Sequence, residues 1–273
     1  MSLRNQKMGF VGCGYIGEAI LAGALSHRLV QARSVFVVEP VAKKQSQIRK
    51  RYRVQIEPSL HALCRKTSVV ILAVKPQQLS EVAHEMKTVL SRNHLVISIL
   101  AGTTTRKLRQ VFGKKPRLAR AMPNLGASVG AAVTAIAQDS PASRQDLKIV
   151  QTIFEGCGEV VFLPEKHMNL VTALSGSGPA YYFFLTEQLI QAGKRHGLNE
   201  KTAHCLAVQT AHAASLLMKT HHISPEQLRK QVTSKKGTTD AAIKVLEKKG
   251  WRKAIHAAVL KAMKRAKQLS RLT

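Results

Sequence analysis

The chain has 273 residues, enough for one large or two ordinary domains, and 45% of them are apolar, enough to build a real core. No run of about 18 uncharged apolar residues occurs, so the sequence predicts no membrane-spanning helix. The 43 Lys and Arg residues outnumber the 15 Asp and Glu residues, which gives a formal net charge of +28.

This basic charge is spread along the whole chain. The densest part, residues 225–273, has 14 Lys and Arg against 3 Asp and Glu, at helical spacing and without an aromatic stacking platform. We therefore expect a solvated basic surface and no nucleic-acid partner. Two alternatives stay open: functional binding of nucleic acid, and attraction of anionic metabolites to the protein.

The cysteines and histidines indicate neither a metal site nor a disulfide framework. No Cys-x-x-Cys occurs among the four scattered cysteines. The spacings of His204, Cys205, His212 and the pair His221-His222 fit no ligand set, so we expect no metal. The stretch 1–9 is too short for a signal peptide. We expect a reduced, cytoplasmic protein.

A glycine-rich stretch opens the chain. The strand-like run 7–11 precedes Gly12-Cys13-Gly14-Tyr15-Ile16-Gly17, and an amphipathic run, 18–27, follows. Strand, Gly-x-Gly-x-x-Gly and helix in this order are the dinucleotide fingerprint. Gly12 permits the tight turn, Gly14 lets the backbone approach a pyrophosphate, and Gly17 lets the helix pack on the strand. The alternative is a tight turn that binds no ligand.

The second strand, 34–38, ends at Glu39, 22 residues past Gly17. A carboxylate at this place usually binds the ribose hydroxyls, and it repels a 2′-phosphate, which favours NADH over NADPH. Two alternatives remain. One is that Lys43 and Lys44, which follow closely in the sequence, bind a 2′-phosphate. The other is that Glu39 only ends the strand.

Strands and helices then alternate, which predicts a doubly wound sheet. The expected strands are 54–56, 68–74, 94–99, 117–122, 131–137 and 159–163, and the expected helices are 41–51, 58–64, one capped by Thr103-Thr104-Thr105, and 141–154. Ligands bind beyond the carboxyl ends of such strands. The loop Lys75-Pro76-Gln77 should therefore line the cofactor groove, although Lys75 also fits a surface lysine and Asn124 also fits a turn residue.

Strand signals stop after Leu163, and helical patterns follow at 167–174, 180–196, 203–219, from Ser224-Pro225, after Asp240 and at 251–269. This half is apolar on several faces, so we expect it to pack against a second copy. The fold class is α/β, with a dinucleotide-binding Rossmann-like domain at 1–163 and an all-helical dimerisation and substrate-binding domain at 164–273.

A cluster of hydroxyls surrounds one glycine in Val232-Thr233-Ser234-Lys235-Lys236-Gly237-Thr238-Thr239, just before a helical pattern. Hydroxyls and free backbone N–H groups at a helix start form an anion site, although a plain N-cap is the alternative. We expect this cluster to hold a small acid.

Several stretches together resemble the pyrroline-5-carboxylate reductase family. They are the glycine motif, Ala73-Val74-Lys75-Pro76-Gln77, Arg120-Ala121-Met122-Pro123-Asn124, Leu174-Ser175-Gly176-Ser177-Gly178-Pro179-Ala180-Tyr181 and the hydroxyl cluster. The resemblance implies reduction of 1-pyrroline-5-carboxylate to L-proline by hydride transfer from NADPH or NADH. It also implies a homodimer through interleaved C-terminal helices, often with five dimers in a ring.

The resemblance also implies roles for single residues. The turn Gly12 to Gly17 would hold the pyrophosphate. The nicotinamide half would lie along Ala73, Val74, Lys75 and Pro76, along Leu100 and Ala101, and near Asn124. The substrate would lie on Ser234, Gly237, Thr238 and Thr239. Apart from the resemblance, a cyclic imine acid needs a polar contact at its nitrogen, and we expect Thr239 to supply it.

The chain departs from the family at two places. The family usually reads Ser-Pro-Gly-Gly where this chain has Ser234-Lys235-Lys236-Gly237, which adds charge near the expected carboxylate site. Many members have an asparagine after the third strand, where this chain has Glu57-Pro58-Ser59-Leu60. Two other activities stay open: reduction of another small imine or hydroxy acid, and NAD(P)H sensing by a nucleic-acid-binding protein.

Overall fold

The computed structural model describes residue 3 and residues 6–272. Residues 1, 2, 4 and 5, part of the stretch considered as a signal peptide, lie outside the described residues. The chain forms two compact units: unit 1 is Met1–Ser177 with Lys261–Thr273, and unit 2 is Gly178–Leu260. The domain boundary expected after residue 163 stays a prediction. The last strand ends there, while unit 1 continues to Ser177.

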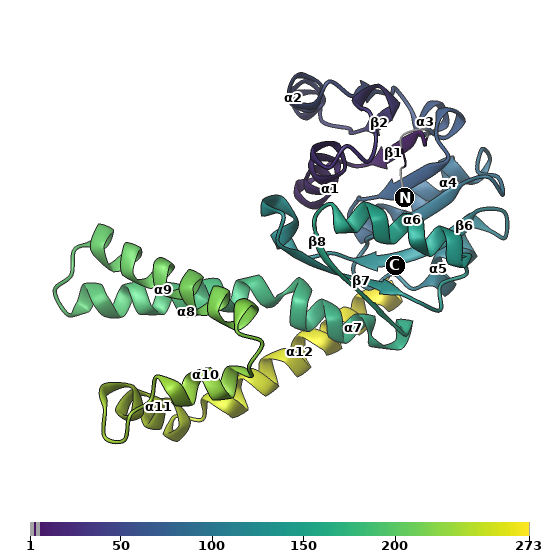
Figure 1. Cartoon of the computed structure of the whole chain (residues 1–273). Coiled ribbons are helices and arrows are strands. Elements are labelled where there is room, and N and C mark those ends of the chain that lie inside the picture. Colours follow the sequence, from purple (N-terminus) through teal and green to yellow (C-terminus); the bar gives the residue numbers. More distant parts are fainter. Residues whose placement is uncertain (1–2, 4–5, 273) are drawn as a thin grey trace. The chain divides into compact units, whose positions relative to one another are not determined.

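Unit 1 is built on one eight-stranded sheet in the order β3-β2-β1-β4-β5-β6-β7-β8 (Figure 1). The strands are β1 (Met8–Val11), β2 (Val35–Val38), β3 (Gln55–Ile56), β4 (Val69–Leu72), β5 (Leu95–Ser98), β6 (Arg117–Met122), β7 (Ala132–Ala137) and β8 (Gly158–Leu163). Strands β1 to β6 are parallel, whereas β7 is antiparallel to β6 and parallel to β8. The reversal follows from the short β6–β7 connection, because a parallel pair needs a longer crossover.

Helices cover both faces of this sheet, as the alternating sequence predicts. The helices are α1 (Tyr15–Ser26), α2 (Ala42–Tyr52), α3 (Leu60–Lys66), α4 (Leu79–Lys87), α5 (Thr105–Phe112) and α6 (Arg144–Glu155), and the short turns are η1 (Ala32–Ser34), η2 (Pro76–Gln78) and η3 (Leu125–Val129). One core contains buried residues of α1, α2 and α6, and the other contains those of α3, α4 and α5. The four central parallel strands are buried apolar runs, as is typical of a sheet covered on both sides.

The segment after β8 also belongs to unit 1. It consists of η4 (Glu165–His167), α7 (Met168–Val171) and η5 (Thr172–Gly176), a single π-helical turn. Met168 is fully buried and packs with Ala135 and Ala137 of β7. The π turn covers the end of the helical pattern expected at 167–174, and α8 starts at Gly178, two residues before the pattern expected at 180–196.

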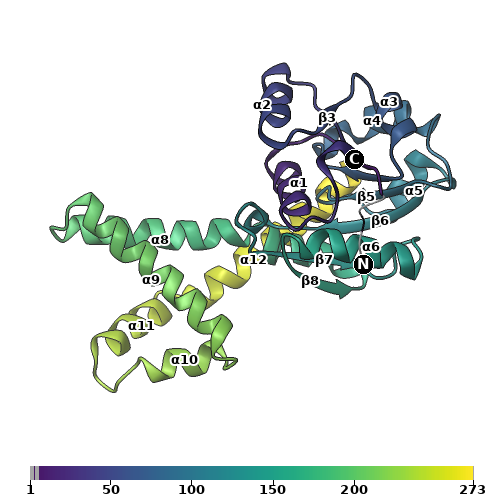
Figure 2. The same ribbon diagram turned by 45° about the horizontal axis from the view of Figure 1, so that its top comes forward.

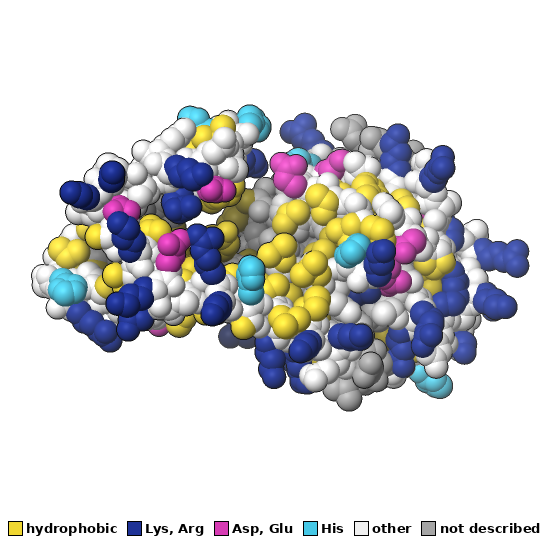
Figure 3. All heavy atoms as spheres, turned by 90° about the horizontal axis from the view of Figure 1, so that it is seen from below, with side chains coloured by type: hydrophobic (Ala, Val, Ile, Leu, Met, Phe, Trp, Pro, Cys, Tyr) yellow, Lys and Arg dark blue, Asp and Glu magenta, His cyan; other side chains and the backbone are white. Residues whose placement is uncertain are grey.

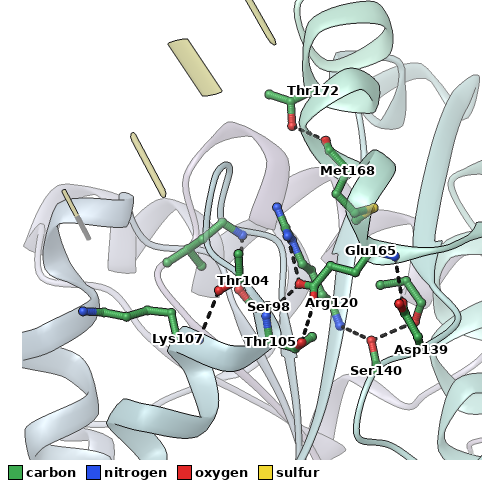
Figure 4. A network of polar contacts seen from close by, with 12 residues as sticks. Ser98, Thr104, Thr105, Lys107, Arg120, Asp139, Ser140, Glu165, Met168 and Thr172 are labelled. Atoms are coloured by element: carbon green, nitrogen blue, oxygen red, sulfur yellow. Dashed lines mark hydrogen bonds and ion pairs between the residues drawn. The ribbon is translucent and has the colours of Figure 1, made fainter. Parts of the chain in front are cut away.

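A buried ion pair ties this segment to the sheet (Figure 4). The Glu165 carboxylate accepts from the Arg120 guanidinium at 2.9 Å and from the Thr105 backbone N–H at 2.7 Å. The Glu165 N–H donates to Asp139 Oδ1 at 2.7 Å. Burial lowers the pKa of Arg120, and its hydrogen bond and attraction to Glu165 oppose that shift. The network fixes the start of η4 against β6 and the start of α5.

Unit 2 contains α8 (Gly178–Arg195), α9 (Glu200–Thr220), α10 (Pro225–Gln231), α11 (Thr238–Lys248) and the first part of α12 (Trp251–Leu272) (Figure 2). Side chains cap two of these helices: Asn199 accepts from the Thr202 N–H, and Ser224 forms a capping box with Gln227. Gly197, at φ +95, follows α8 in a conformation that favours glycine.

Large apolar side chains of these helices lie open to solvent. On α8 and α9 they include Tyr182, Phe183, Phe184, Leu206 and Leu216, each more than half exposed in the single chain. Figure 3 shows apolar side chains in yellow lying open on one face of the molecule. A patch of this kind marks an interaction surface. Within the described residues, no helix is both long and apolar enough to cross a bilayer.

Candidate cofactor and substrate sites

The glycine turn joins β1 to α1, and its three glycines differ in what surrounds them. Gly12 has φ +76, and a Cβ there would meet Val74 Cγ1 at 2.9 Å. A Cβ on Gly17 would meet Ala73 Cβ at 3.0 Å. A Cβ on Gly14 would meet nothing within 4 Å. The fold itself therefore needs Gly12 and Gly17, whereas the space at Gly14 is open for a ligand.

The start of α1 fits an anion. Gly14 is the N-cap and supplies no side-chain hydrogen bond, so the first N–H groups of the helix have no side-chain partner there. Such groups, together with the helix dipole, bind phosphate. Tyr15 is 64% exposed, and its hydroxyl lies 3.3 Å from Ser128 Oγ. Ile16 packs against the core beneath the turn. The residues present fit a dinucleotide pyrophosphate.

Glu39 lies at the end of β2, next to this turn. Its carboxylate accepts from the Cys13 N–H at 3.0 Å and from the Val41 N–H at 3.3 Å. It thus has the structural task of holding the turn. Each carboxylate oxygen retains further acceptor capacity, which suits the two ribose hydroxyls of an adenosine.

The Cys13 thiol does not take part in chemistry at this place. Burial raises its pKa to about 12, and the negative charges of Glu18 and Glu39 add to the effect. Burial also raises the pKa of Cys64 and of Cys157 to about 11. These thiols stay protonated at neutral pH and are weak nucleophiles. No group of three or more potential metal ligands occurs in the described residues.

The other expected cofactor residues follow neighbouring strands at the same edge of the sheet. The β1–β4–β5–β6 register pairs Val11 with Leu72, Leu72 with Ser98, and Ser98 with Arg120. Because the strands are parallel, the loops that follow them lie side by side. These loops contain Ala73, Val74, Lys75 and Pro76 after β4, Leu100 and Ala101 after β5, and Asn124 after β6. Pro76 begins η2, and Lys75 is exposed, as the alternative of a surface lysine requires.

Asn124 has well-defined partners in its loop. Its Oδ1 accepts from the N–H groups of Gly126 and Val133, and its Nδ2 donates to Ser175 Oγ at 3.3 Å. Ser175 lies in the motif Leu174–Tyr181, and sequence reasoning missed its contact with Asn124. The contact spans 51 residues, and no local pattern indicates it.

The expected substrate residues lie at the start of α11 in unit 2. The N-cap is Gly237, with no side-chain hydrogen bond, so the hydroxyl cluster does not act as a plain N-cap for α11. In the part of the chain that the structure describes, the hydroxyls of Ser234, Thr238 and Thr239 make no hydrogen bond. The structure therefore brings together a helix start and three hydroxyls that are free for a ligand.

Lysine and aspartate side chains modify this helix start. Lys236 has φ +63, in the left-handed region that favours glycine, and its N–H donates to Asp240 Oδ2 at 3.2 Å. Asp240 also pairs with Lys244 at 2.8 Å, and this hydrogen bond lowers the pKa of Asp240. Because Lys244 offsets the charge of Asp240, the aspartate does not by itself make the site repel a carboxylate.

Two family models match the chain, one in each half. Residues 165–269 match the family model for pyrroline-5-carboxylate reductase dimerisation, and residues 7–102 match the model for NADP oxidoreductases dependent on coenzyme F420. The chain is 37% identical to a pyrroline-5-carboxylate reductase of Synechocystis sp., across 97% of this chain and 98% of the relative. It is 35% identical to one of Methanosarcina acetivorans, across 98% and 100%.

Solved structures agree in fold. A pyrroline-5-carboxylate reductase from Coxiella burnetii superposes with a TM-score of 0.89 at 33% identity, covering 97% of this chain and 98% of that one. A crystal structure of the Plasmodium falciparum enzyme with NADP bound gives 0.88 at 28% identity, covering 98% and 99%.

Proposed function

The chain belongs to the pyrroline-5-carboxylate reductase family, and from this premise we propose which of its residues carry the reaction. It reduces 1-pyrroline-5-carboxylate to L-proline, the last step of proline biosynthesis, with NAD(P)H as the cofactor. When bound, the cofactor supplies the hydride. The chain must therefore hold a dinucleotide, fix the carboxylate of a cyclic imine acid and contact the imine nitrogen.

Unit 1 holds the cofactor. The space at Gly14 and the uncapped start of α1 suit the pyrophosphate. The pyrophosphate half of the cofactor site consists of the turn residues Gly12, Cys13, Gly14, Tyr15, Ile16 and Gly17. The nicotinamide half consists of Ala73, Val74, Lys75, Pro76, Leu100, Ala101 and Asn124. Glu39 sets the preference between NADH and NADPH. A fixed buried carboxylate accepts ribose hydroxyls and repels a 2′-phosphate, so we propose NADH as the better cofactor.

The loop before α11 holds the substrate. Ser234, Gly237 and Thr238 supply hydroxyl and backbone N–H donors for the carboxylate, and Thr239 contacts the imine nitrogen. The observation that carries this assignment is that all three hydroxyls lack partners at a helix start without a side-chain cap. Substrate carboxylates bind well at such a place, because oriented N–H groups and the helix dipole both favour negative charge.

The reaction needs positioning more than strong acid catalysis. A threonine hydroxyl is a weak acid, so Thr239 hydrogen-bonds the nitrogen or passes it a proton from water. An imine that arrives already protonated needs only to be held.

A single substitution tests this assignment. Thr239→Ala should lower kcat at least tenfold, an order-of-magnitude expectation for a lost contact to the reacting group, and leave the NADH dissociation constant within about twofold. Thr239→Ser should restore much of the rate. Thr233→Ala is the matched control, since the Thr233 hydroxyl donates to the Arg229 carbonyl at 2.6 Å. Wild-type kcat in Thr239→Ala would remove Thr239 from the mechanism.

We also propose that residues 164–273 form a dimerisation and substrate-binding domain, that two chains pair through it, and that five dimers form a ring in the cytoplasm. The exposed apolar side chains of α8 and α9 support pairing, because isolated chains rarely leave so much apolar surface in water. Light scattering on the purified protein tests the assembly. A mass of twice or ten times the 29.9 kDa of one chain is expected, and a monomer would refute it.

A further inference from the structure

We propose that the Ser175 hydroxyl donates a hydrogen bond to the carboxamide oxygen of the bound nicotinamide, and that Asn124 sets the direction of that bond. The proposal rests on the proposed function only for the identity of the cofactor. Both residues belong to unit 1, which also contains the glycine turn.

The orientation of the Asn124 amide is fixed by chemistry. Its Oδ1 lies 3.2 Å from the Gly126 nitrogen and 3.3 Å from the Val133 nitrogen. Backbone N–H groups only donate, so the atom that faces both of them must be the amide oxygen. The amide nitrogen then necessarily faces Ser175, with 3.3 Å between Nδ2 and Oγ. Asn124 therefore acts toward Ser175 as a donor and never as an acceptor.

This fixes what the Ser175 hydroxyl can do. A hydroxyl has one proton to donate, and here its oxygen accepts from Asn124. In the part of the chain that the structure describes, Ser175 donates no hydrogen bond, and the residue is only half-buried. Its proton is thus available to an acceptor that reaches the site.

The backbone around Ser175 is unusual and well held. The Ser177 N–H donates to the Thr172 carbonyl at 2.8 Å, a π-type bond across five residues. A Cβ on Gly176 would meet Met122 Cε at 2.9 Å, so the turn packs closely on the end of β6. Single π turns inside helices occur frequently at functional sites. This one brings a serine to the loop that follows β6.

The acceptor follows from the location. Asn124 comes two residues after β6, and β6 neighbours β5, whose loop contains Leu100 and Ala101. Neighbouring strands lie about 4.8 Å apart, so these loops line one stretch of the carboxyl edge, where nicotinamide binds in such sheets. The carboxamide is the only hydrogen-bonding group on that ring. A hydroxyl with a free proton matches its oxygen and would fix the rotation of the ring.

Calorimetric titration with two dinucleotides tests the proposal without turnover. Thio-NADH carries sulfur, a weak acceptor, in place of the carboxamide oxygen. Ser175→Ala should weaken NADH binding by roughly three- to tenfold, the loss of one neutral hydrogen bond. It should change thio-NADH binding by less than about twofold, because that bond is already lost. An equal loss with both dinucleotides, or no loss with NADH, overturns the proposal.

Three further variants separate this role from a structural one. Ser175→Thr keeps a hydroxyl and should restore NADH binding. Thr172→Ala perturbs the same π turn through a hydroxyl that donates to the Met168 carbonyl, and should leave binding unchanged. Asn124→Asp keeps the acceptor for Gly126 and Val133 but cannot donate. The Ser175 hydroxyl would then donate to the carboxylate introduced by this substitution and not to the nicotinamide.

Asn124→Asp should therefore reproduce the defect of Ser175→Ala, and combining the two should add nothing. Additive losses would refute the role of Asn124. If the variants change NADH and thio-NADH binding as expected, yet the wild-type protein does not reduce pyrroline-5-carboxylate, the proposed function fails and this inference stands.

Discussion

Removing the charge of Glu165 should destabilise the protein strongly, because it leaves a buried cation without its counter-ion. The Arg120 side chain is 3% exposed and that of Glu165 is 20% exposed. Breaking a buried pair by removing one partner costs about 3–5 kcal/mol. The partial exposure of Glu165 places Glu165→Gln near the lower end, about 3 kcal/mol. For a chain of this size that corresponds to a fall in Tm of roughly 6–12 °C.

Differential scanning calorimetry measures this fall. A second variant tests the reason for it: Arg120→Met combined with Glu165→Gln removes both charges and keeps an acceptor for the Thr105 N–H. The double variant should be more stable than Glu165→Gln alone, since no unpaired charge is buried. Glu226→Gln is the matched control. It breaks an exposed pair with Lys230, and Tm should not change measurably. A Tm for Glu165→Gln within about 2 °C of the wild type, or a double variant no better than the single one, would refute the reasoning.

Three other predictions follow from the site. Gly14→Leu should keep the wild-type Tm, because nothing lies within 4 Å of a Cβ there, and should abolish NADH binding in calorimetric titration; retained binding would place the pyrophosphate elsewhere. Glu39→Gln removes a charge but keeps an acceptor for the Cys13 N–H, so the ratio of NADPH to NADH dissociation constants should fall at least tenfold, about the effect expected when one close repulsive charge is lost; an unchanged ratio would leave Glu39 with only its structural task. Lys236→Gly relieves a left-handed backbone and should raise the free energy of unfolding by about 1 kcal/mol. The same change should raise KM for pyrroline-5-carboxylate as a positive charge leaves the loop, whereas lower stability in denaturant titration would contradict the strain argument.

Local patterns in the sequence were sufficient for the fold class and for much of the cofactor site. Buried parallel strands are continuous apolar runs, and the Gly-x-Gly-x-x-Gly motif before α1 is a pattern of six consecutive residues. The caps at Asn199 and Ser224 are equally local, since each side chain bonds a backbone group three residues away. These features need no knowledge of which distant segments meet.

Contacts between distant segments were decided only by the tertiary structure. The Arg120–Glu165 pair spans 45 residues, and the contact between Asn124 and Ser175 spans 51. The reversal of β7 and β8 and the left-handed φ of Lys236 were also invisible in the sequence. A residue pattern reports the preferences of a few neighbouring residues. The direction of a hydroxyl proton at Ser175 depends on an amide that only the folded chain brings to it.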